Sequence, residues 1–453
     1  MTAPASASSR LVKCIEARPV RRVSGRATLP GDKSISHRSI LLSALASGES
    51  EVRGFLASED CLASLKAMQA LGVRIEQPDP ARVRVRGVGL HGLKAAAHAL
   101  DMGNAGTAMR LFAGLLAAQS FDSTLIGDES LMRRPMERVA RPLREMGADV
   151  RTHDGKPPLE IGGGRRLHGI MYRMPVASAQ VKSALLVAGL YADGPTTVSS
   201  PAACRDHSER MLSSAGVRLD TNGLVTTVHP PERLESQTLE VPGDFSSAAF
   251  FIVAGLLGAG PDGLLLENVG LNPTRTGLLD ILRAMGGRIE VENPRSSGAE
   301  PVADLRVYNS ALQGIDVPPA AVPLAIDEFP VLFIAAACAR GQTRVTGAEE
   351  LRVKESDRIA AMAAGLEATG VVHEATPDGM HIEGKPEGAA FRGGEIDSRG
   401  DHRIAMAFSI ASLRAAKPIA VRDTANVATS FPGFVALARA VGLDLAESSV
   451  AGT

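Results

Sequence analysis

Apolar residues along the chain follow one pattern that recurs six times. In each copy, an Ala/Leu-rich stretch with helical spacing leads through a small or charged turn into a stretch typical of a strand. The apolar stretches begin near His37, Thr107, Gln180, Ser247, Phe329 and His402. The strands after them contain EVRGFL, STLIG, TTVSS, LLLENV, TRVTG and IAVRD. We therefore predict an α/β protein built from repeated units.

A second pattern places a glycine between the end of a helix and the start of a strand. The glycines recur at intervals of roughly 70 residues, at Gly72, Gly147, Gly216, Gly286, Gly370 and Gly442. A glycine just past a helix is the usual left-handed cap, and the VRIE after Gly72 alternates as a strand does. A unit of this length is too small to be a comfortable domain alone, so we expect the units to pack together.

The repeat also has a coarser level. Pro-Gly-Asp occurs at Pro30–Asp32 and again, three units later, at Pro242–Asp244. This spacing predicts two similar lobes of three units each, joined at these turns. Chance similarity among Gly-rich loops is the alternative, which six ordered copies of two patterns disfavour.

Unusual polar residues gather where the Ala/Leu-rich helices begin. Free N–H groups and the positive end of the helix dipole make such positions good anion sites. Asp244 and Ser246 are ordinary N-cap types, so we interpret them as caps. Lys33 and Arg38 are different, because a cap needs no cation beside the positive end of a dipole. The pattern therefore favours an enzyme whose helix N-termini bind small, multiply anionic substrates.

Two basic segments leave the choice between a solvated surface and an anion site open. Arg133 and Arg134 precede a proline-started helix, where a solvated basic turn is an equal alternative. Glu350–Arg358 packs six charged residues into nine, and such a run is usually a solvated helix face. If it is helical, Lys354 and Arg358 project together, which suits a phosphate clamp.

Two further segments receive structural interpretations. Arg205–Glu209 is expected to cap the helix that contains Met211 and Leu212. Gly162–Gly164, followed by two arginines, resembles a phosphate loop but lacks the strand–GxGxxG–helix context. We interpret it as a flexible hairpin.

Composition narrows the class of partner. The 453 residues carry a formal net charge of −1, which argues against nucleic acid as the main partner. No uncharged apolar stretch reaches about 18 residues, so no membrane helix is predicted. Residues 1–9 are small and polar, are expected to be disordered, and lack the apolar core of a secretory signal. Four dispersed cysteines indicate reduced thiols in a cytosolic protein, and ten unclustered histidines predict no metal site.

Seven segments occur in the order in which one enzyme family carries them: LPGDKSISHRS, GNAGTAMR, RRPM, SAQVKSA, DEFP, LRVKESDR and DHRIAM. On these segments the chain resembles the 5-enolpyruvylshikimate-3-phosphate (EPSP) synthases over nearly its whole length. Arg205–Glu209 and Asn272–Arg275 resemble the class II branch. The resemblance implies a two-lobed inverse α/β barrel in which each lobe holds three repeated βαβαββ subdomains.

The resemblance also implies how the chain is divided. Residues 31–243 would form an N-terminal lobe that binds shikimate 3-phosphate. Residues 1–30 plus 244–453 would form a C-terminal lobe that includes the N-terminal strand and carries the phosphoenolpyruvate and proton-transfer residues. Crossovers would lie near 27–31 and 240–245.

The implied reaction transfers the enolpyruvyl group of phosphoenolpyruvate to the 5-hydroxyl of shikimate 3-phosphate and releases phosphate. It belongs to chorismate and aromatic amino acid biosynthesis and is the activity of a 3-phosphoshikimate 1-carboxyvinyltransferase. It would need no cofactor and no metal. We expect a cytoplasmic monomer whose partners are these two small molecules, with no nucleic acid and no membrane.

Family roles carry over onto matching residues. The shikimate 3-phosphate site would consist of Lys33, Ser34, Arg38, Ser178, Ala179, Gln180, Arg205, Asp327 and Lys354. The phosphoenolpyruvate site would consist of Lys33, Gly106, Arg134, Gln180, Arg358, His402 and Arg403. The catalytic residues would be Lys33, Asp327 and Glu355. Asp327 would take the proton of the 5-hydroxyl, and Glu355 would handle the proton at the enol methylene.

The sequence departs from the family pattern in two places. Many members carry a lysine just before a T-F-P segment, but Ala428–Pro432 has none, so one phosphate contact is absent or replaced. Tolerant class II members carry alanine at the position of Gly106, where a methyl group crowds the inhibitor glyphosate. We expect Gly106 to leave that space open, although Leu111 stands where the other branch often has proline. These residues favour a glyphosate-sensitive target.

Three rival functions are weaker. The sister enzyme that transfers enolpyruvate to UDP-N-acetylglucosamine typically uses a loop cysteine, but Cys61 and Cys204 both lie outside the 127–136 loop. A non-catalytic, anion-binding relative would have lost its carboxylates, yet Asp327 and Glu355 are present. An enzyme acting on nucleic-acid ends is disfavoured by the near-zero charge and the few aromatic residues.

Overall fold

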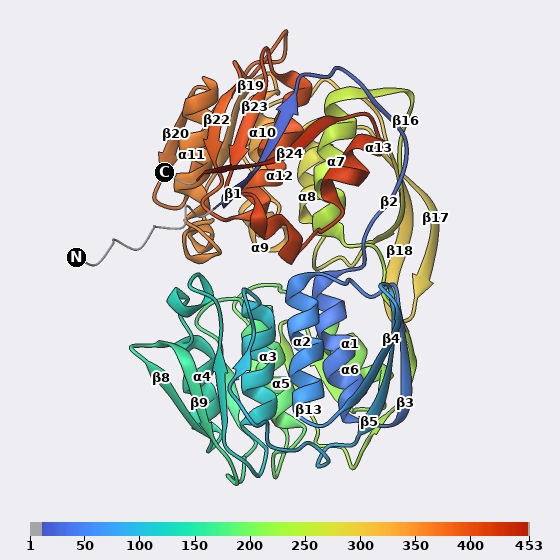
Figure 1. Ribbon diagram of the computed structural model, residues 1–453, viewed down its shortest axis with the longest axis vertical. Coiled ribbons are helices and arrows are strands. Elements are labelled where there is room, and N and C mark those ends of the chain that lie inside the picture. Colours follow the sequence, from blue (N-terminus) through green and yellow to red (C-terminus); the bar gives the residue numbers. More distant parts are fainter. Residues whose placement is uncertain (1–10, 452–453) are drawn as a thin grey trace, which may run out of the picture.

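The computed structural model describes residues 11–451, which form two lobes, one above the other in Figure 1. The disorder expected for residues 1–9 lies outside this range. Each lobe encloses its own hydrophobic core. One core draws its buried residues from between Ile35 and Val241, and the other from Ile15–Leu29 and from between Phe245 and Leu445. The predicted two-lobed α/β architecture is therefore present.

Three sheets belong to the lower lobe. The first contains β3 (Ala46–Arg53), β4 (Arg74–Asp79), β5 (Arg82–Val88), β14 (Leu234–Glu235) and β15 (Thr238–Glu240). The second contains β6 (Leu100–Asp101), β7 (Ser123–Ile126), β8 (Asp149–His153) and β9 (Lys156–Gly162). The third contains β10 (Met171–Arg173), β11 (Thr196–Ser199), β12 (Leu219–Asn222) and β13 (Val225–Val228). The helices are α1 (Lys33–Leu45), α2 (Glu59–Ala70), α3 (Gly106–Leu116), η1 (Leu131–Arg133), α4 (Glu137–Glu145), α5 (Ala179–Gly189) and α6 (His207–Ser214).

Three more sheets belong to the upper lobe. The strands of the first lie in the order β22 (Gly394–Asp397), β23 (Ile419–Arg422), β1 (Leu11–Arg18) and β24 (Asp444–Ala451). Those of the second lie in the order β17 (Ile289–Ser297), β18 (Glu300–Val307), β16 (Ala259–Gly270) and β2 (Val23–Thr28). Those of the third lie in the order β19 (Gly341–Val345), β21 (Gly379–Gly384) and β20 (His373–Thr376). The longer helices are α7 (Phe245–Gly258), α8 (Gly277–Ala284), α10 (Phe329–Ala337), α11 (Arg358–Thr369), α12 (His402–Ala411) and α13 (Phe434–Ala440). The short ones are η2 (Pro319–Ala321), α9 (Val322–Ala325), η3 (Glu349–Val353), η4 (Ser412–Arg414) and η5 (Ala425–Thr429).

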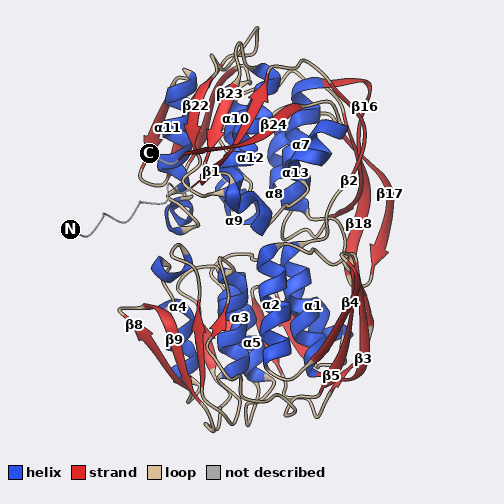
Figure 2. Cartoon of the chain, viewed as in Figure 1, coloured by secondary structure: helices blue, strands red, loops and turns tan. Residues whose placement is uncertain are grey.

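The six Ala/Leu-rich stretches of the sequence are the inner helices of the two lobes. They are α1, α3, α5, α7, α10 and α12, and Figure 2 shows helices at the centre of each lobe with sheets toward the outside. Every residue of α7, α10 and α12 is buried. A helix that is apolar on all sides is stable only when it is surrounded. The apolar pattern thus explains why helices fill the interior and sheets cover it.

The six glycines predicted to end helices all have left-handed backbones, with φ from 79° at Gly370 to 108° at Gly442. Residues with a Cβ rarely adopt this conformation, so glycine turns the chain sharply from helix to strand at these points. These predictions are confirmed, as are the strands predicted after the inner helices.

The two Pro-Gly-Asp turns lie side by side where the chain passes between the lobes. Asp32 N donates to Pro242 O and Asp244 N donates to Pro30 O, each at a distance of 2.8 Å. A Cβ on Gly31 would lie 1.8 Å from the carbonyl oxygen of Gly54, so only glycine fits there. Two strands, β1 and β2, precede this point, and both pair with strands of the upper lobe.

The structure corrects several local predictions. The segment Glu350–Arg358 is not one helix: η3 ends at Val353, and α11 begins only at Arg358. The Gly162–Gly164 segment is not a hairpin, because it leads from β9 into a different sheet. Pro135 does not start α4, since it precedes the N-cap residue Met136.

Two further corrections concern helix starts. The first inner helix begins at Lys33, one turn before His37, because Asp32 caps it. Within the described chain, the side chain of Asp206 makes no cap hydrogen bond at the start of α6. It accepts hydrogen bonds from Arg210 and Asn272 instead.

Candidate active site

A cavity of about 310 Å³ lies between the lobes, and residues of both lobes line it. The helix starts predicted to bind anions face this cavity. Twelve of the candidate residues line it: Lys33, Ser34, Arg134, Ser178, Ala179, Gln180, Arg205, Asp327, Lys354, Glu355, His402 and Arg403. Among the described residues, Arg38, Gly106 and Arg358 are not part of its wall. The structure therefore brings together residues that are up to several hundred positions apart.

The N-terminal turn of α1 places Lys33 between the lobes. Asp32 caps the helix by accepting a hydrogen bond from Ile35 N at 2.9 Å, which fixes the first turn. The ammonium group of Lys33 donates to Asp60 Oδ2 at 2.9 Å and to Ser430 Oγ at 2.6 Å. Ser430 belongs to the segment in which the family lysine is missing. The hydroxyl group that faces Lys33 thus comes from the residue after Thr429, the position where the family lysine is missing.

Arg38 lies one turn further along α1 and is buried. Its guanidinium donates to Ser34 O at 2.9 Å and to the hydroxyls of Ser183 and Ser208, both at 2.7 Å. Burial lowers the pKa of Arg38 to about 10, because the charged form loses hydration. In this geometry Arg38 supports Ser34 from behind, and a direct contact with substrate stays a prediction.

Two arginines lie beside the N-terminus of α3. A Cβ on Gly106 would lie 3.0 Å from Nη1 of both Arg110 and Arg134. A methyl group at this position would require both guanidinium groups to shift slightly, by a few tenths of an ångström, whereas glycine leaves that space to them or to a ligand. That Gly106 leaves room for the inhibitor stays a prediction.

Arg110 is a site residue that the sequence analysis missed. Its guanidinium donates to Gln180 Oε1 at 2.7 Å and to the carbonyl oxygens of Gly106 and Pro135, both at 3.1 Å. Burial, together with Arg134, lowers its pKa to about 10. A cation four residues into an otherwise apolar helix was the available signal.

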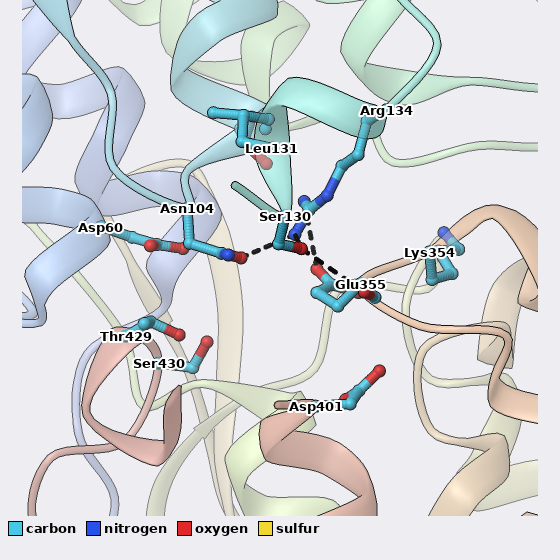
Figure 3. Close-up of polar contacts among 12 residues, drawn as sticks. Asp60, Asn104, Ser130, Leu131, Arg134, Lys354, Glu355, Asp401, Thr429 and Ser430 are labelled. Carbon is cyan, nitrogen blue, oxygen red and sulfur yellow. Dashed lines mark hydrogen bonds and ion pairs between the residues drawn. The ribbon is translucent and has the colours of Figure 1, made fainter. Parts of the chain in front are cut away.

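The loop before α4 contacts the upper lobe. Arg134 donates to Asn104 Oδ1 at 2.6 Å, and its Nη1 lies 3.7 Å from Glu355 Oε1 (Figure 3). Ser130 Oγ lies 3.5 Å from the carbonyl oxygen of Glu355. Nearer the rim, Arg138 and Glu350 form an ion pair of 2.9 Å. These contacts join the two lobes around the cavity.

Asp327 lies among cations at the start of α10. It pairs with Arg205 of the lower lobe, with Lys354 Nζ at 3.3 Å and with Arg358 Nη1 at 3.4 Å. Burial opposes the ionised form, but these cations outweigh it, so the pKa of Asp327 lies well below its usual value. The carboxylate is therefore ionised near pH 7.

Glu355 has a similar environment. Its Oε2 accepts from Arg358 Nη2 at 2.6 Å, and burial is outweighed by Arg358 and Arg134, so its pKa also lies well below the usual value. Arg358 further donates to Asp401 Oδ2 at 2.9 Å. Lys354 and Arg358 do converge, but on Asp327 and through a loop rather than by helical spacing. Asp401, which sequence reasoning treated only as part of a helix start, holds Arg358 in place.

His402 lies at the start of α12, with Nε2 at 3.1 Å from Ser430 Oγ. Burial and then Lys33 and Arg403 hold the pKa of His402 well below its usual value. The imidazole is therefore neutral near pH 7, so it contributes a hydrogen bond to the site and no charge.

The arrangement combines anion-binding groups with two ionised carboxylates that accept protons. Cations and helix N-termini can hold two anions close together, while Asp327 and Glu355 can transfer protons between them. Within residues 11–451, no group of three or more His, Cys, Asp or Glu side chains could hold a metal ion. No helix of that range is long and apolar enough to span a bilayer.

Known proteins share both the sequence and the fold. The family model for EPSP synthase (3-phosphoshikimate 1-carboxyvinyltransferase) matches residues 17–437. A 3-phosphoshikimate 1-carboxyvinyltransferase of Methylococcus capsulatus is 58% identical over 431 residues, which cover 95% of this chain and 98% of the relative. One from Alkalilimnicola ehrlichii is 56% identical, over 96% of this chain and 97% of the relative.

Solved structures agree. The EPSP synthase of Acinetobacter baumannii superposes with a TM-score of 0.86 at 51% identity, covering 96% of this chain and all of that one. The enolpyruvyl transferase NikO of Streptomyces tendae has a TM-score of 0.78 at 17% identity over 97% of this chain and 100% of its own, which shows a shared fold. The chain therefore belongs to the EPSP synthase family.

Proposed function

We propose that the protein transfers the enolpyruvyl group of phosphoenolpyruvate to the 5-hydroxyl of shikimate 3-phosphate, giving 5-enolpyruvylshikimate 3-phosphate and phosphate. The observation that carries the proposal is the meeting of two ionised carboxylates, Asp327 and Glu355, with cations from both lobes in one cavity. Membership of the EPSP synthase family supports the same reaction.

The two ends of phosphoenolpyruvate fit different cations. Its phosphate fits the N-terminus of α3 at Gly106, beside Lys33 and Arg134, because backbone N–H groups and the helix dipole favour a compact anion there. Its carboxylate fits Arg358 and Arg403, whose planar guanidinium groups can bind a carboxylate with two hydrogen bonds.

Shikimate 3-phosphate fits the lower lobe and its border. Ser178 caps α5, so its hydroxyl and the first N–H groups of that helix lie at the cavity. Arg205 and Lys354 both pair with Asp327 from opposite lobes. A phosphate bound by Arg205 would release Asp327 to contact the 5-hydroxyl.

The reaction proceeds in two balanced stages. Protonation of the methylene carbon by Glu355 creates positive charge at C2, the 5-hydroxyl oxygen forms a bond to C2, and Asp327 takes the hydroxyl proton. Glu355 then takes a methyl proton from the tetrahedral intermediate, the double bond forms again as the bond from C2 to the phosphate oxygen breaks, and Asp327 gives the hydroxyl proton to the departing phosphate. Substrate anions that compensate Arg134 and Arg358 raise the pKa of Glu355 and allow it to carry the first proton.

Phosphate release from the purified protein tests this function. We expect release from phosphoenolpyruvate only when shikimate 3-phosphate is present, and none when UDP-N-acetylglucosamine replaces it. Release that does not depend on shikimate 3-phosphate would overturn the proposal. Release with the nucleotide sugar would point to the sister reaction instead.

We also propose that residues 31–243 form one lobe and residues 1–30 plus 244–453 the other, and that ligands close them. The separate hydrophobic cores support this division. Small-angle scattering should show a smaller radius of gyration when both substrates are bound, and an unchanged radius would contradict closure.

The location, oligomeric state and partners of the enzyme are also part of what we propose. We propose a cytoplasmic monomer that acts on small molecules, with neither nucleic acid nor membrane as a partner. Glyphosate is proposed as an inhibitor that competes with phosphoenolpyruvate. An inhibition constant far above the KM for phosphoenolpyruvate would contradict this.

A further inference from the structure

Two carboxylates lie next to each other at the start of α10, but only one faces the cavity. The side chain of Asp327 is 14% exposed and lines the cavity, whereas that of Glu328 is 1% exposed and lies behind the wall. In the described part of the chain, the side chain of Glu328 makes no cap hydrogen bond to its own helix. A buried carboxylate is costly unless other groups compensate it, so its partners indicate what it does.

The partners of Glu328 lead to Arg403. Ser246 donates a hydrogen bond to Glu328 Oε1, and Nη1 of Arg403 lies 3.7 Å from the same oxygen. Nη1 of Arg403 also donates to the carbonyl oxygen of Asp327 at 2.9 Å. Within residues 11–451, Glu328 is the one carboxylate within 4.0 Å of the Arg403 guanidinium.

Arg358, the other arginine proposed for the substrate carboxylate, is held very differently. It pairs with three carboxylates, those of Asp327, Glu355 and Asp401. The orientation of Arg358 therefore survives the loss of one partner more easily. Among the described residues, the guanidinium of Arg403 has one hydrogen-bond acceptor, the carbonyl oxygen of Asp327, and one nearby carboxylate, that of Glu328.

Glu328 is itself fixed by the region where the chain crosses between the lobes. Arg275 Nη2 lies 4.0 Å from Glu328 Oε1 and donates to Ser246 Oγ at 2.5 Å. Arg275 also donates to Asp32 at 2.6 Å and to Asp244 at 3.2 Å, the cap residues of α1 and α7. A continuous set of buried polar contacts thus connects both Pro-Gly-Asp turns to Arg403.

We propose that Glu328 is a positioning residue that orients the guanidinium of Arg403 toward the carboxylate of phosphoenolpyruvate. The proposal rests on the proposed function, because it needs Arg403 to bind that carboxylate. With Glu328 behind it, the guanidinium keeps its remaining N–H groups for the cavity. Without that charge, Arg403 is free to turn toward Asp244 or Asp327, and its donors leave the substrate.

The test is Glu328→Gln, which keeps the shape and removes the charge. We expect the KM for phosphoenolpyruvate to rise about tenfold and the KM for shikimate 3-phosphate to change less than about twofold. Inhibition by inorganic phosphate should stay unchanged, because phosphate has no carboxylate to bind at Arg403. This difference separates an effect at Arg403 from a general loss of structure.

Glu300→Gln is the matched control. Glu300 is also buried in the upper lobe, but it pairs with His207 and Asn272 and not with Arg403. We expect Glu300→Gln to leave unchanged the ratio of the KM for phosphoenolpyruvate to the inhibition constant for inorganic phosphate. Adding Glu328→Gln to Arg403→Gln should raise the KM for phosphoenolpyruvate no further, since the residue it positions is gone.

Three outcomes would overturn the proposal: an unchanged KM for phosphoenolpyruvate in Glu328→Gln, an equal weakening of phosphate inhibition, or additive effects with Arg403→Gln. If circular dichroism shows that Glu328→Gln does not fold, Ser246→Ala decides, because it keeps the charge of Glu328 and removes the hydroxyl that donates to Glu328 and accepts from Arg275. It should raise the KM for phosphoenolpyruvate by a smaller factor, and no change would count against the proposal. Failure of the proposed function itself would appear in the unmodified protein, as phosphate release without dependence on shikimate 3-phosphate.

Discussion

The two lobes repeat one architecture but supply different chemistry to the cavity. The lower lobe contributes Lys33, Arg134, Gln180 and Ser178 to the cavity wall, and Lys33 is paired with Asp60 of the same lobe. The upper lobe contributes Asp327 and Glu355, each surrounded by cations. Under the proposed function, cations of both lobes hold substrate charge, and the carboxylates that move protons come from the upper lobe alone. The difference lies in the few residues at helix starts, since the inner helices of both lobes are alike.

The largest expected effect concerns Asp327, the carboxylate of the upper lobe that is proposed to take the hydroxyl proton. Asp327→Asn should lower kcat by about 10³-fold and leave both KM values within a fewfold, because the amide cannot accept the hydroxyl proton. Steady-state phosphate release measures both constants. Equal losses in kcat and binding would mean that Asp327 is structural, and the division of labour between the lobes would fail.

The next largest effect concerns Lys33, the cation of the lower lobe that is proposed to contact both substrates. Lys33→Ala should lower kcat/KM by about 100-fold, since one ammonium contacts both substrates in the proposed complex. It should also weaken inhibition by inorganic phosphate, unlike Asp327→Asn. Near-normal kinetics would place the anion site elsewhere in the lower lobe.

A smaller effect concerns two buried histidines, one in an inner helix of each lobe. His37 in α1 and His402 in α12 are both buried. Burial lowers the pKa of His37 to about 3, and its Nδ1 lies 2.7 Å from Ser64 Oγ. The unfolded chain takes up a proton near pH 6.5 and the folded chain does not, so His37 costs stability as the pH falls below about 6.5.

Between pH 6.5 and pH 5 this loss should amount to about 1.5 kcal/mol, and His37→Gln should not show it. Urea unfolding at both pH values provides the measurement. The variant should be less stable at pH 7 but should lose less on acidification. Parallel losses in both proteins would show that His37 is protonated in the folded state.

The smallest effect concerns the rim where the lobes meet. Arg138 and Glu350 are both partly exposed, and exposed ion pairs contribute little. Arg138→Ala or Glu350→Ala should raise the KM for phosphoenolpyruvate about two- to threefold, and the double variant no further. Added salt should remove the difference from the unmodified protein. Additive effects would show that the pair does not join the lobes during turnover.

Much of the fold could be predicted because its causes are local. The six left-handed glycines and the apolar stretches of α7 and α10 dictate their own conformations. The site was harder to predict because its contacts join distant residues. Asp327 and Glu328 are neighbours in one motif, and only the packing shows which carboxylate faces the cavity.

Charge in Glu350–Arg358 misled the helix prediction for a related reason. Asp357 caps α11, and Arg352 pairs with Asp357 at 2.8 Å, so the segment bends where helical spacing predicted continuity. The cap and the ion pair compete with the helix, and their relative strength depends on the surrounding lobe. Arg110 was overlooked because its side-chain partner Gln180 lies in the next unit.

The position of β1 constrains the order in which the protein can be completed on the ribosome. β1 lies between β23 and β24, and Ile15 is paired with both Val421 and Glu447, near the opposite end of the chain. β1 therefore waits for two strands that are synthesised much later. The core of the lower lobe comes from one continuous stretch and can assemble while translation continues. β2 can pair once β16 has been made, whereas β1 stays unpaired until β23 and β24 follow, which makes β1 the strand most in need of protection from aggregation.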